Sequence, residues 1–450
     1  MAKIKEHLSH LSAVQIIVLY YVVAVIVAMA LFSLPIARNP GSQWGFIEAL
    51  FTAVSAVSVT GLTVVSTAET FSVPGTFILA FVLQFGGIGI MTLGTFVWML
   101  FRRKIGLRER QLIMTDQNRG EMAGLVMIMK QILIMILAIE AIGALILSIH
   151  FLQYFPTWQE AFIQGFFASV SATTNAGFDI TGSSLEPFAH DYFVQFVNMI
   201  LLVLGAIGFP VLIELKEFLT AKERPFNKRF SLYTKLTTTT FGLLVLVGFL
   251  GILLLERNHF FLDKSWHETF FYALFQSVTT RNGGLATMDV AEFYIPTQLF
   301  LSALMFIGAS PSSVGGGIRT TTFAIVILTI YTFARGKSSI KLFGREIDQE
   351  DMLKSFIVIS VAIMLTASAV IFLAYIEPFP LTAIIFEVCS AFGTTGLSMG
   401  ITADLSTAGK LTIIFLMFVG RIGVFAFLFI IRGKLTDEHY HYPKERVIIG

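Results

Sequence analysis

Long apolar stretches alternate with short polar connections along the whole chain. Runs of mostly apolar residues occupy positions 13–34, 77–101, 132–152, 193–212 and 356–375. A helix needs about 20 such residues to cross the roughly 30 Å of hydrocarbon in a bilayer. The pattern therefore predicts an all-α integral membrane protein.

A second pattern, a half-length apolar run that ends in polar residues and a glycine, recurs four times. It reads EALFTAVSAVSVTGLT (48–63), EAFIQGFFASVSATTNAGFD (160–179), ETFFYALFQSVTTRNGGLAT (268–287) and AIIFEVCSAFGTTGLS (383–398). The period is about 110 residues, which indicates an internal repeat. About a dozen apolar residues suit a re-entrant helix better than a full span. We expect four tandem repeats of span, re-entrant pore helix, filter strand and span, eight spans in all around a central pore, with boundaries at 1–112, 113–228, 229–345 and 346–450.

Composition and charge sharpen this prediction. Hydrophobic residues make up 55% of the chain and charged residues only 13%, against about 25% charged residues in soluble globular chains. Lys and Arg gather at every second connection, for example at 102–104, 222–229 and 335–345. Such connections face the cytoplasm by the positive-inside rule. We therefore expect a multi-pass protein of the cell membrane with both termini in the cytoplasm.

One glycine in each repeat is the best candidate for a cation-binding position. Carbonyl oxygens around an axis can replace the hydration shell of an alkali cation, and glycine permits the backbone conformation that aims them inward. One such run alone is more often an ordinary turn, but four at one spacing favour a selectivity filter. The aligned glycines are Gly61, Gly177, Gly284 and Gly396. The flanking residues that would add further oxygen ligands are Val59, Thr60, Asn175, Ala176, Asn282, Gly283, Thr394 and Thr395.

A glycine cluster also falls within the second span of each repeat, at 84–90, 204–210, 307–318 and 419–425. For the first two clusters, close helix packing is the alternative explanation. The third cannot be a regular helix, and irregular backbone at this depth must be buried in protein or line a water-filled cavity. We expect it to form a gate with the arginine of the fourth cluster. The gate residues would be Gly308, Ala309, Ser310, Pro311, Ser312, Ser313, Gly315, Gly316, Gly317 and Arg421.

Three more ionisable residues lie within predicted membrane segments: Glu140, Arg281 and Glu387. Charges at this depth are functional candidates by default. Glu140 and Arg281 carry opposite charges in adjacent repeats, and Glu387 lies in the fourth re-entrant helix. We favour structural ion pairs or braces for these residues.

Other chemistry has little support in the sequence. The single Cys389 excludes an intrachain disulfide and a thiolate cluster. GGGIR at 315–319 follows no strand of a βαβ unit, so it does not indicate nucleotide binding. HYHYP at 439–443 fits an exposed tail better than a metal site. We expect no enzyme activity, no cofactor within this chain and no nucleic-acid partner.

The motifs resemble the Trk/Ktr/HKT superfamily of potassium transporters. The resemblance rests on the four repeats, on SVTTRNGGL at 277–285 and on GASPSSVGGGIRTTTF at 308–323, and it covers essentially the whole chain. With eight predicted spans, the chain is most similar to KtrB, the membrane subunit of bacterial Ktr systems. The resemblance implies that the four glycines coordinate K⁺, that the loop at 308–317 gates the pore, and that Arg421 stands beside this loop.

The resemblance carries further implications. It implies a homodimer in the lipid bilayer, with one pore per chain, docked on a cytosolic RCK-type ring of the KtrA or KtrC kind that binds the nucleotide. Serine at the position of Gly61 is associated with Na⁺ selectivity in some plant relatives, so Gly61 favours K⁺. The gate loop carries Ala309, Ser312, Val314 and Arg319 where Gly, Gly, Thr and Lys are more typical. The alternative function is a secondary transporter that couples K⁺ or Na⁺ movement to another ion.

Overall fold

The computed structural model describes residues 13–42, 44–89, 125–221, 230–431, 443 and 445. These residues form four helical segments. Segment 1 contains α2 (Ala13–Phe32), α3 (Phe46–Ser58), α4 (Thr67–Thr70) and α5 (Val73–Ile88). Segment 2 contains α8 (Leu125–Phe151), α9 (Trp158–Thr173), α10 (Tyr192–Ala206) and α11 (Phe209–Thr220). Segment 3 contains α12 (Leu232–Glu256), α13 (Trp266–Thr279), α14 (Ile295–Phe306) and α15 (Thr320–Ala334). Segment 4 contains α16 (Gln349–Ile376), α17 (Leu381–Gly393), α18 (Thr407–Ile422) and α19 (Val424–Ile431).

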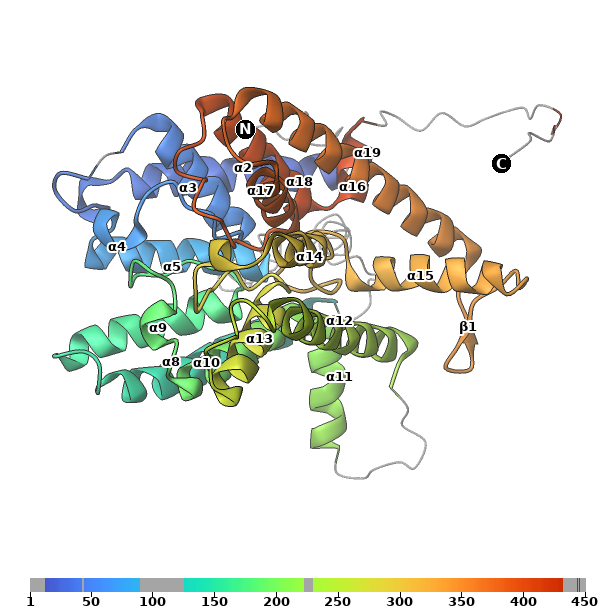
Figure 1. Cartoon of the computed structure of the whole chain (residues 1–450), viewed down its shortest axis with the longest axis horizontal. Coiled ribbons are helices and arrows are strands. Elements are labelled where there is room, and N and C mark those ends of the chain that lie inside the picture. Colours follow the sequence, from blue (N-terminus) through green and yellow to red (C-terminus); the bar gives the residue numbers. More distant parts are fainter. Residues whose placement is uncertain are drawn as a thin grey trace.

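Short elements connect these helices. Turns of 3-10 helix cover Pro35–Ala37, Glu186–Phe188 and Val290–Glu292. An antiparallel hairpin of β1 (Lys341–Leu342) and β2 (Arg345–Glu346) joins α15 to α16. Figure 1 shows this hairpin at the far end of α15.

Four continuous helices are long and apolar enough to cross a membrane: α2, α8, α12 and α16. The pairs α10–α11 and α18–α19 would add two spans if each pair counts as one, but they bend by 104° and 102°. The prediction of a continuous helix over 193–212 is therefore wrong, because α10 ends at Ala206. The described residues thus give four spans, or six with the bent pairs, and the figure of eight stays a prediction. Residues 90–101 of the expected span 77–101 lie outside the described residues.

Each bend occurs at a glycine in a conformation that other residues rarely adopt. Gly208 separates α10 from α11 with φ of 102°, and Gly423 separates α18 from α19 with φ of 91°. Gly89, directly after α5, has φ of 93°. Three of the predicted glycine clusters therefore end a helix. Gly86, Gly205 and Gly420 in these clusters also lie against the backbone of a short helix, so close packing applies to them as well.

In every segment the first long helix ends beside the start of the later helix. Glu256 at the end of α12 accepts from the Tyr294 N–H at 2.8 Å, and Glu377 after α16 accepts from the Ser406 N–H at 3.0 Å. His150 and Asp191 lie 2.5 Å apart at the corresponding ends of α8 and α10. In segment 1, Ser72 donates its hydroxyl to the carbonyl of residue 36 at 2.5 Å. The short helix between each pair therefore enters and returns on the same face, as a re-entrant helix does.

The segments pack in a closed cycle. The later helix of each segment contacts the short helix of the next: α5 contacts α9, α10 contacts α13, α14 contacts α17, and α18 contacts α3. In Figure 1 the blue helices of segment 1 accordingly lie beside the red helices of segment 4. The ends of the four short helices are therefore brought to the middle of the molecule.

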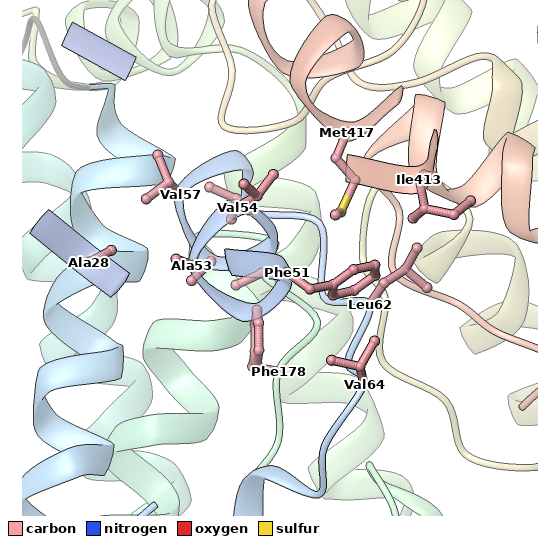
Figure 2. Packing of buried hydrophobic residues seen from close by; sticks show 14 of the residues in the cluster. Ala28, Phe51, Ala53, Val54, Val57, Leu62, Val64, Phe178, Ile413 and Met417 are labelled. Carbon is pink, nitrogen blue, oxygen red and sulfur yellow. The ribbon is translucent and has the colours of Figure 1, made fainter. Parts of the chain in front are cut away.

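The contact between segments 1 and 4 illustrates how this cycle is held. Figure 2 shows Phe51 and Leu62 of segment 1 packed towards Ile413 and Met417 of α18, with Phe178 of segment 2 nearby. These side chains are almost fully buried. Inside a bilayer, close van der Waals packing holds helices together because the lipid is as apolar as the side chains.

Candidate functional site

The four aligned glycines meet in a closed ring. Gly61, Gly177, Gly284 and Gly396 follow the ends of α3, α9, α13 and α17, with φ of 92°, 67°, 69° and 95°. A methyl group built on Gly61 would lie 2.9 Å from the Cα of Gly177, and one on Gly177 would lie 2.9 Å from the Cα of Gly284. The corresponding distances are 3.4 Å from Gly284 to Gly396 and 3.1 Å from Gly396 to Gly61. The ring follows the order of the sequence.

A backbone carbonyl of the next segment lies beside each ring glycine. The methyl built on Gly61 would lie 2.5 Å from the oxygen of Ala176, and the one on Gly177 would lie 3.4 Å from the oxygen of Gly283. Methyls on Gly284 and Gly396 would contact the oxygens of Thr395 and Thr60 in the same way. A side chain at any ring position would therefore displace the neighbouring backbone.

The short helices all end with the same unusual turn. The residue two positions before each ring glycine is in the left-handed region, with φ between 52° and 68°: Val59, Asn175, Asn282 and Thr394. Non-glycine residues pay roughly 1–2 kcal/mol there. The N–H of the next residue donates to a carbonyl of the short helix at 2.6–2.9 Å and so closes the turn. The donor and acceptor pairs are Thr60 and Ser55, Ala176 and Ser171, Gly283 and Thr279, and Thr395 and Ser390. Three of these turns span five residues, whereas the turn closed by Gly283 and Thr279 spans four.

Buried hydroxyl groups brace these turns, which the sequence analysis missed. Ser55 accepts from the N–H of Gly61 at 3.2 Å, and Ser390 accepts from the N–H of Gly396 at 3.0 Å. The other two donate to the carbonyl after the ring glycine: Ser171 to Phe178 at 2.5 Å and Thr279 to Leu285 at 2.6 Å. Each aligned glycine has a Ser or Thr five or six positions before it, and this regular spacing could have identified the bracing hydroxyl groups.

The expected gate loop, residues 308–317 between α14 and α15, binds to the breaks in other helices. The Ser310 N–H donates to the carbonyl of Ala206 at 3.1 Å, and the N–H of residue 209 donates to the Ser312 carbonyl at 2.8 Å. The N–H of Gly317 donates to the carbonyl of Gly420 at 3.0 Å. The loop is thus held at once by segments 2 and 4.

The remaining loop residues are packed into the same structure. Ala309 is fully buried, and the carbonyl of Pro311 accepts from the Tyr233 hydroxyl at 2.6 Å. Ser313 donates its hydroxyl to the Ser310 carbonyl at 2.6 Å. Ser312, which stands where glycine is more typical, has φ of 52°. The sequence indicates this departure from glycine but not the backbone strain that it brings.

The side chain of Thr394 joins the loop to the ring. Its hydroxyl oxygen accepts from the N–H of Gly316 at 2.8 Å and from the amide of Asn282 at 2.9 Å. Gly315 also lies close to the Asn282 side chain, and Gly308 lies close to the backbone of Gly316. Thr394 and Asn282 were expected from the sequence only as flanking ligands, and their contact with the loop was not predicted.

Arg421 lies where the sequence analysis expected it, against the loop. Its guanidinium donates to the carbonyls of Val314 in the loop and Gly86 in α5, and reaches the carbonyl of Gly87 at 3.4 Å. Arginine suits this position because its planar group presents several donors at fixed angles. Arg421 therefore connects segments 1, 3 and 4.

The expected ion pairs are wrong for the three other intramembrane charges. Glu140 accepts from the amide of Gln84, and Glu387 accepts from the hydroxyls of Ser398 and, at 3.1 Å, Thr402. Arg281, which is 1% exposed, donates to the carbonyl of residue 307 at 2.8 Å and to that of residue 304. Among the described residues none of the three has an oppositely charged partner. Glu387 therefore links α17 to the chain after Gly396. Arg281 links the turn before Gly284 to the end of α14.

Acidic side chains gather beyond the ring, where the chains after Gly177 and Gly284 run side by side. The N–H of residue 185 donates to the carbonyl of residue 286 at 2.9 Å. Burial raises the pKa of Glu186, and the carboxylates of Asp289, Glu292 and Asp179 raise it further. The four carboxylates lie close enough to interact, and a group of negative charges attracts cations.

Residues 34–440 match the family model described as "TrkH: Cation transport protein". The chain belongs to this family. It is 60% identical over 440 residues to "Ktr system potassium uptake protein D" of Bacillus subtilis, with 98% of each chain covered. It is 34% identical to "Ktr system potassium uptake protein B" of the same organism, over 97% of this chain and 96% of that one. Similarity to "Potassium/sodium uptake protein NtpJ" of Enterococcus hirae reaches 33% identity over 98% of each.

A solved structure of the TrkH family shares the fold. The "Potassium Transporter TrkH from Vibrio parahaemolyticus" superposes with a TM-score of 0.73 at 19% identity, covering 94% of this chain and 85% of that one. The expectation of a KtrB-like member of the Trk/Ktr/HKT group is confirmed at the level of the family. The chain is therefore a helical, multi-pass membrane protein of a family of transporters, not of enzymes.

Proposed function

We propose that this chain is the ion-conducting membrane subunit of a K⁺ uptake system, with the glycine ring as its selectivity filter. The observation that carries the proposal is the closed ring in which each glycine lies beside a carbonyl of the next segment. Carbonyl rings of this kind replace the hydration shell of a passing alkali cation. The names of the relatives from Bacillus subtilis, both potassium uptake proteins, support K⁺ as the cargo.

The proposal assigns roles within the site. The ring glycines and the residues on either side of the left-handed turns would supply the K⁺ ligands, and the four repeats, with the boundaries expected from the sequence, would each supply one quarter. The loop at 308–317 and Arg421 would form the gate on the cytoplasmic side. Its hydrogen bonds with Thr394, with Arg421 and with the backbone of segments 2 and 4 support this role, because a movement of the loop would break them.

Flux of ⁸⁶Rb⁺ into liposomes containing the purified protein tests the conducting role. We expect passive uptake driven by a membrane potential. A chain that carried no passive Rb⁺ flux, with or without a cytosolic partner, would contradict the proposal.

A matched pair of variants tests the filter itself. Gly284→Ser adds a side chain against the carbonyl of Thr395, so we expect it to lower the preference for Rb⁺ over Na⁺ by about tenfold, the effect of about 1.4 kcal/mol. Gly400→Ser is the control, because Gly400 also has positive φ, 83°, but has open space around its Cα. Equal ion preference in both variants would refute the filter assignment.

Regulation and assembly form part of the same proposal. A homodimer on a cytosolic RCK-type ring, with nucleotide bound to that partner and both termini in the cytoplasm, fits the resemblance and the basic connections. Light scattering of the purified protein tests the dimer. Rb⁺ flux with and without the candidate ring and varied nucleotides tests the regulation.

The second candidate is a secondary transporter that couples K⁺ or Na⁺ to another ion. The bends of 104° and 102° favour it, because discontinuous helices are common at transporter sites. The reversal potential separates the two functions. A channel-like pathway reverses at the K⁺ equilibrium potential, whereas a coupled transporter shifts with the gradient of the second ion.

A further inference from the structure

A basic cavity lies at the end of α15, far from the glycine ring. It has a volume of about 480 Å³ and is formed by the last turn of α15 and the chain that leads into β1. Three cationic side chains line it, Arg335, Lys337 and Lys341, and none of the described residues in its wall is acidic. Pockets of roughly 300–1,000 Å³ are the usual size for small-molecule ligands.

Contacts within the chain hold the wall of the cavity in place. Ile340 is buried and its carbonyl accepts from the N–H of Ile347 at 3.0 Å, and the Arg335 guanidinium lies 4.4 Å from the centre of the Tyr331 ring. Ser338 and Ser339, which also line the cavity, bring hydroxyl groups beside the three cations. Cations and hydroxyl donors together match the oxygen atoms of a phosphate group.

The helix next to the cavity presents apolar side chains to its surroundings. Ile327, Ile330 and Phe333 of α15 are 49%, 53% and 82% exposed. In a multi-pass membrane protein, exposed apolar side chains of this kind suit contact with lipid acyl chains. The basic residues follow directly after this apolar surface, which is the order expected where acyl chains give way to lipid headgroups.

We propose that this cavity binds the headgroup of an acidic phospholipid, with its acyl chains along α15. Basic pockets beside membrane helices on the cytoplasmic side recognise such headgroups, and each Lys or Arg near the surface contributes about 1 kcal/mol. A lipid ties β1, and with it the connection between segments 3 and 4, to the bilayer. A free phosphate offers the same charge but has no part that would use the apolar face of α15.

Native mass spectrometry of the detergent-purified protein tests the proposal. The protein is titrated with dioctanoyl phosphatidylglycerol, with dioctanoyl phosphatidylcholine and with inorganic phosphate. We expect the phosphatidylglycerol to bind at least tenfold more tightly than either of the other two. Equal affinity for phosphatidylcholine would overturn the proposal, and so would equal affinity for inorganic phosphate, which would show a site for soluble anions.

Matched variants locate the binding. Lys337→Gln with Lys341→Gln should weaken phosphatidylglycerol binding about 25-fold, a factor of about five for each charge. Lys216→Gln with Lys354→Gln removes the same charge from α11 and α16, outside the cavity, and should leave binding unchanged. The assignment would be contradicted if both pairs weakened binding equally, or if neither pair weakened it.

Arg335→Gln should also weaken phosphatidylglycerol binding, and Arg335→Lys should restore most of it. This test does not depend on ion selectivity, so its failure would leave the proposed function untouched.

Discussion

At the scale of single residues, backbone strain collects around the ring. Val59 and Thr394 are β-branched residues in the left-handed region, where such side chains are genuine outliers. Both are fully buried at the ends of short helices that neighbouring segments hold in place. Strain of this kind persists only where the surrounding structure fixes it, and it clusters at functional sites. The strained turns therefore support the ring as the functional centre.

The hydroxyl of Thr394 should matter more than that of its neighbour. Thr394→Val leaves the buried N–H of Gly316 without its acceptor, whereas the amide of Asn282 keeps the carbonyls of Gly393 and Thr394. A buried unpaired donor costs about 1–3 kcal/mol. We expect a clearly lower temperature of unfolding in detergent and a higher basal Rb⁺ flux, because the loop loses its contact with the ring. The control is Thr395→Val, since the Thr395 hydroxyl is buried without a hydrogen bond. The two variants are compared by unfolding temperature, because Thr395 also flanks the proposed filter. Equal effects of both variants would show that Thr394 does not join ring and loop.

Arg421 should hold the gate closed. Arg421→Lys keeps the charge but cannot reproduce the planar group that binds the carbonyls of Val314 and Gly86 together. Loss of about 1.4 kcal/mol from the closed state would raise the basal Rb⁺ flux about tenfold. Arg319→Lys is the comparison, because Arg319 donates to the Gly315 carbonyl within its own segment. Unchanged flux in Arg421→Lys, measured in the same liposomes, would argue against a gating role.

At the scale of elements, the helices broken in mid-membrane are what the sequence predicted least well. Hydropathy identified α2, α8 and α16 because length and apolar composition are enough to indicate a span, whereas α12 was expected only from the repeat. It could not locate the bend after Ala206, because the residues on both sides are apolar and the bend depends on Gly208 and its contacts with a loop about 100 residues later.

The ring and the loop also differ in how well the sequence predicted them. Gly61, Gly177, Gly284 and Gly396 were found because four copies of one pattern outweigh the ambiguity of each. The contact of Thr394 with Gly316 spans 78 residues and occurs once, so no repetition revealed it. The hydrogen-bond partners of Glu140 were missed because an opposite charge is the simplest partner to expect in a membrane, whereas the amide of Gln84 satisfies the same carboxyl.

The two bent helices offer a test of how tightly each bend is coupled to the loop. Gly423→Ala places a methyl in open space, so it should cost only the strain of positive φ, roughly 1–2 kcal/mol. Gly208→Ala pays the same strain and also places its methyl 2.9 Å from the carbonyl of Pro311 and 3.1 Å from the Tyr233 hydroxyl. We therefore expect Gly208→Ala to lower the unfolding temperature more and to disturb Rb⁺ flux more. The reverse order would mean that the loop does not depend on the α10–α11 bend.

At the scale of the whole molecule, charge is distributed unequally between the two faces. The short helices start, and the chains that leave the ring return, on the face that carries Asp179, Glu186, Asp289 and Glu292. The basic cavity with Arg335 and Lys341 lies at the end of α15 beside the hairpin. These acidic side chains form an acidic mouth that raises the local concentration of cations, and the basic cavity on the opposite face suits a lipid headgroup. Both features fit inward cation movement across the bilayer.

The acidic mouth should accelerate uptake only when salt does not screen it. Glu186→Gln together with Glu292→Gln keeps the shape of two exposed side chains and removes two negative charges. We expect the initial rate of Rb⁺ uptake to fall by a factor of about two to ten at 10 mM ionic strength, where the screening length is about 30 Å. At about 0.15 M, where this length is about 8 Å, the uptake rate of the variant should approach that of the unmodified chain.

The control is Glu346→Gln with Asp351→Asn, which removes the same charge near the hairpin, on the other face. A loss of rate that persisted at high salt would point to a structural defect. An equal loss in the control would show that total charge matters and the mouth does not.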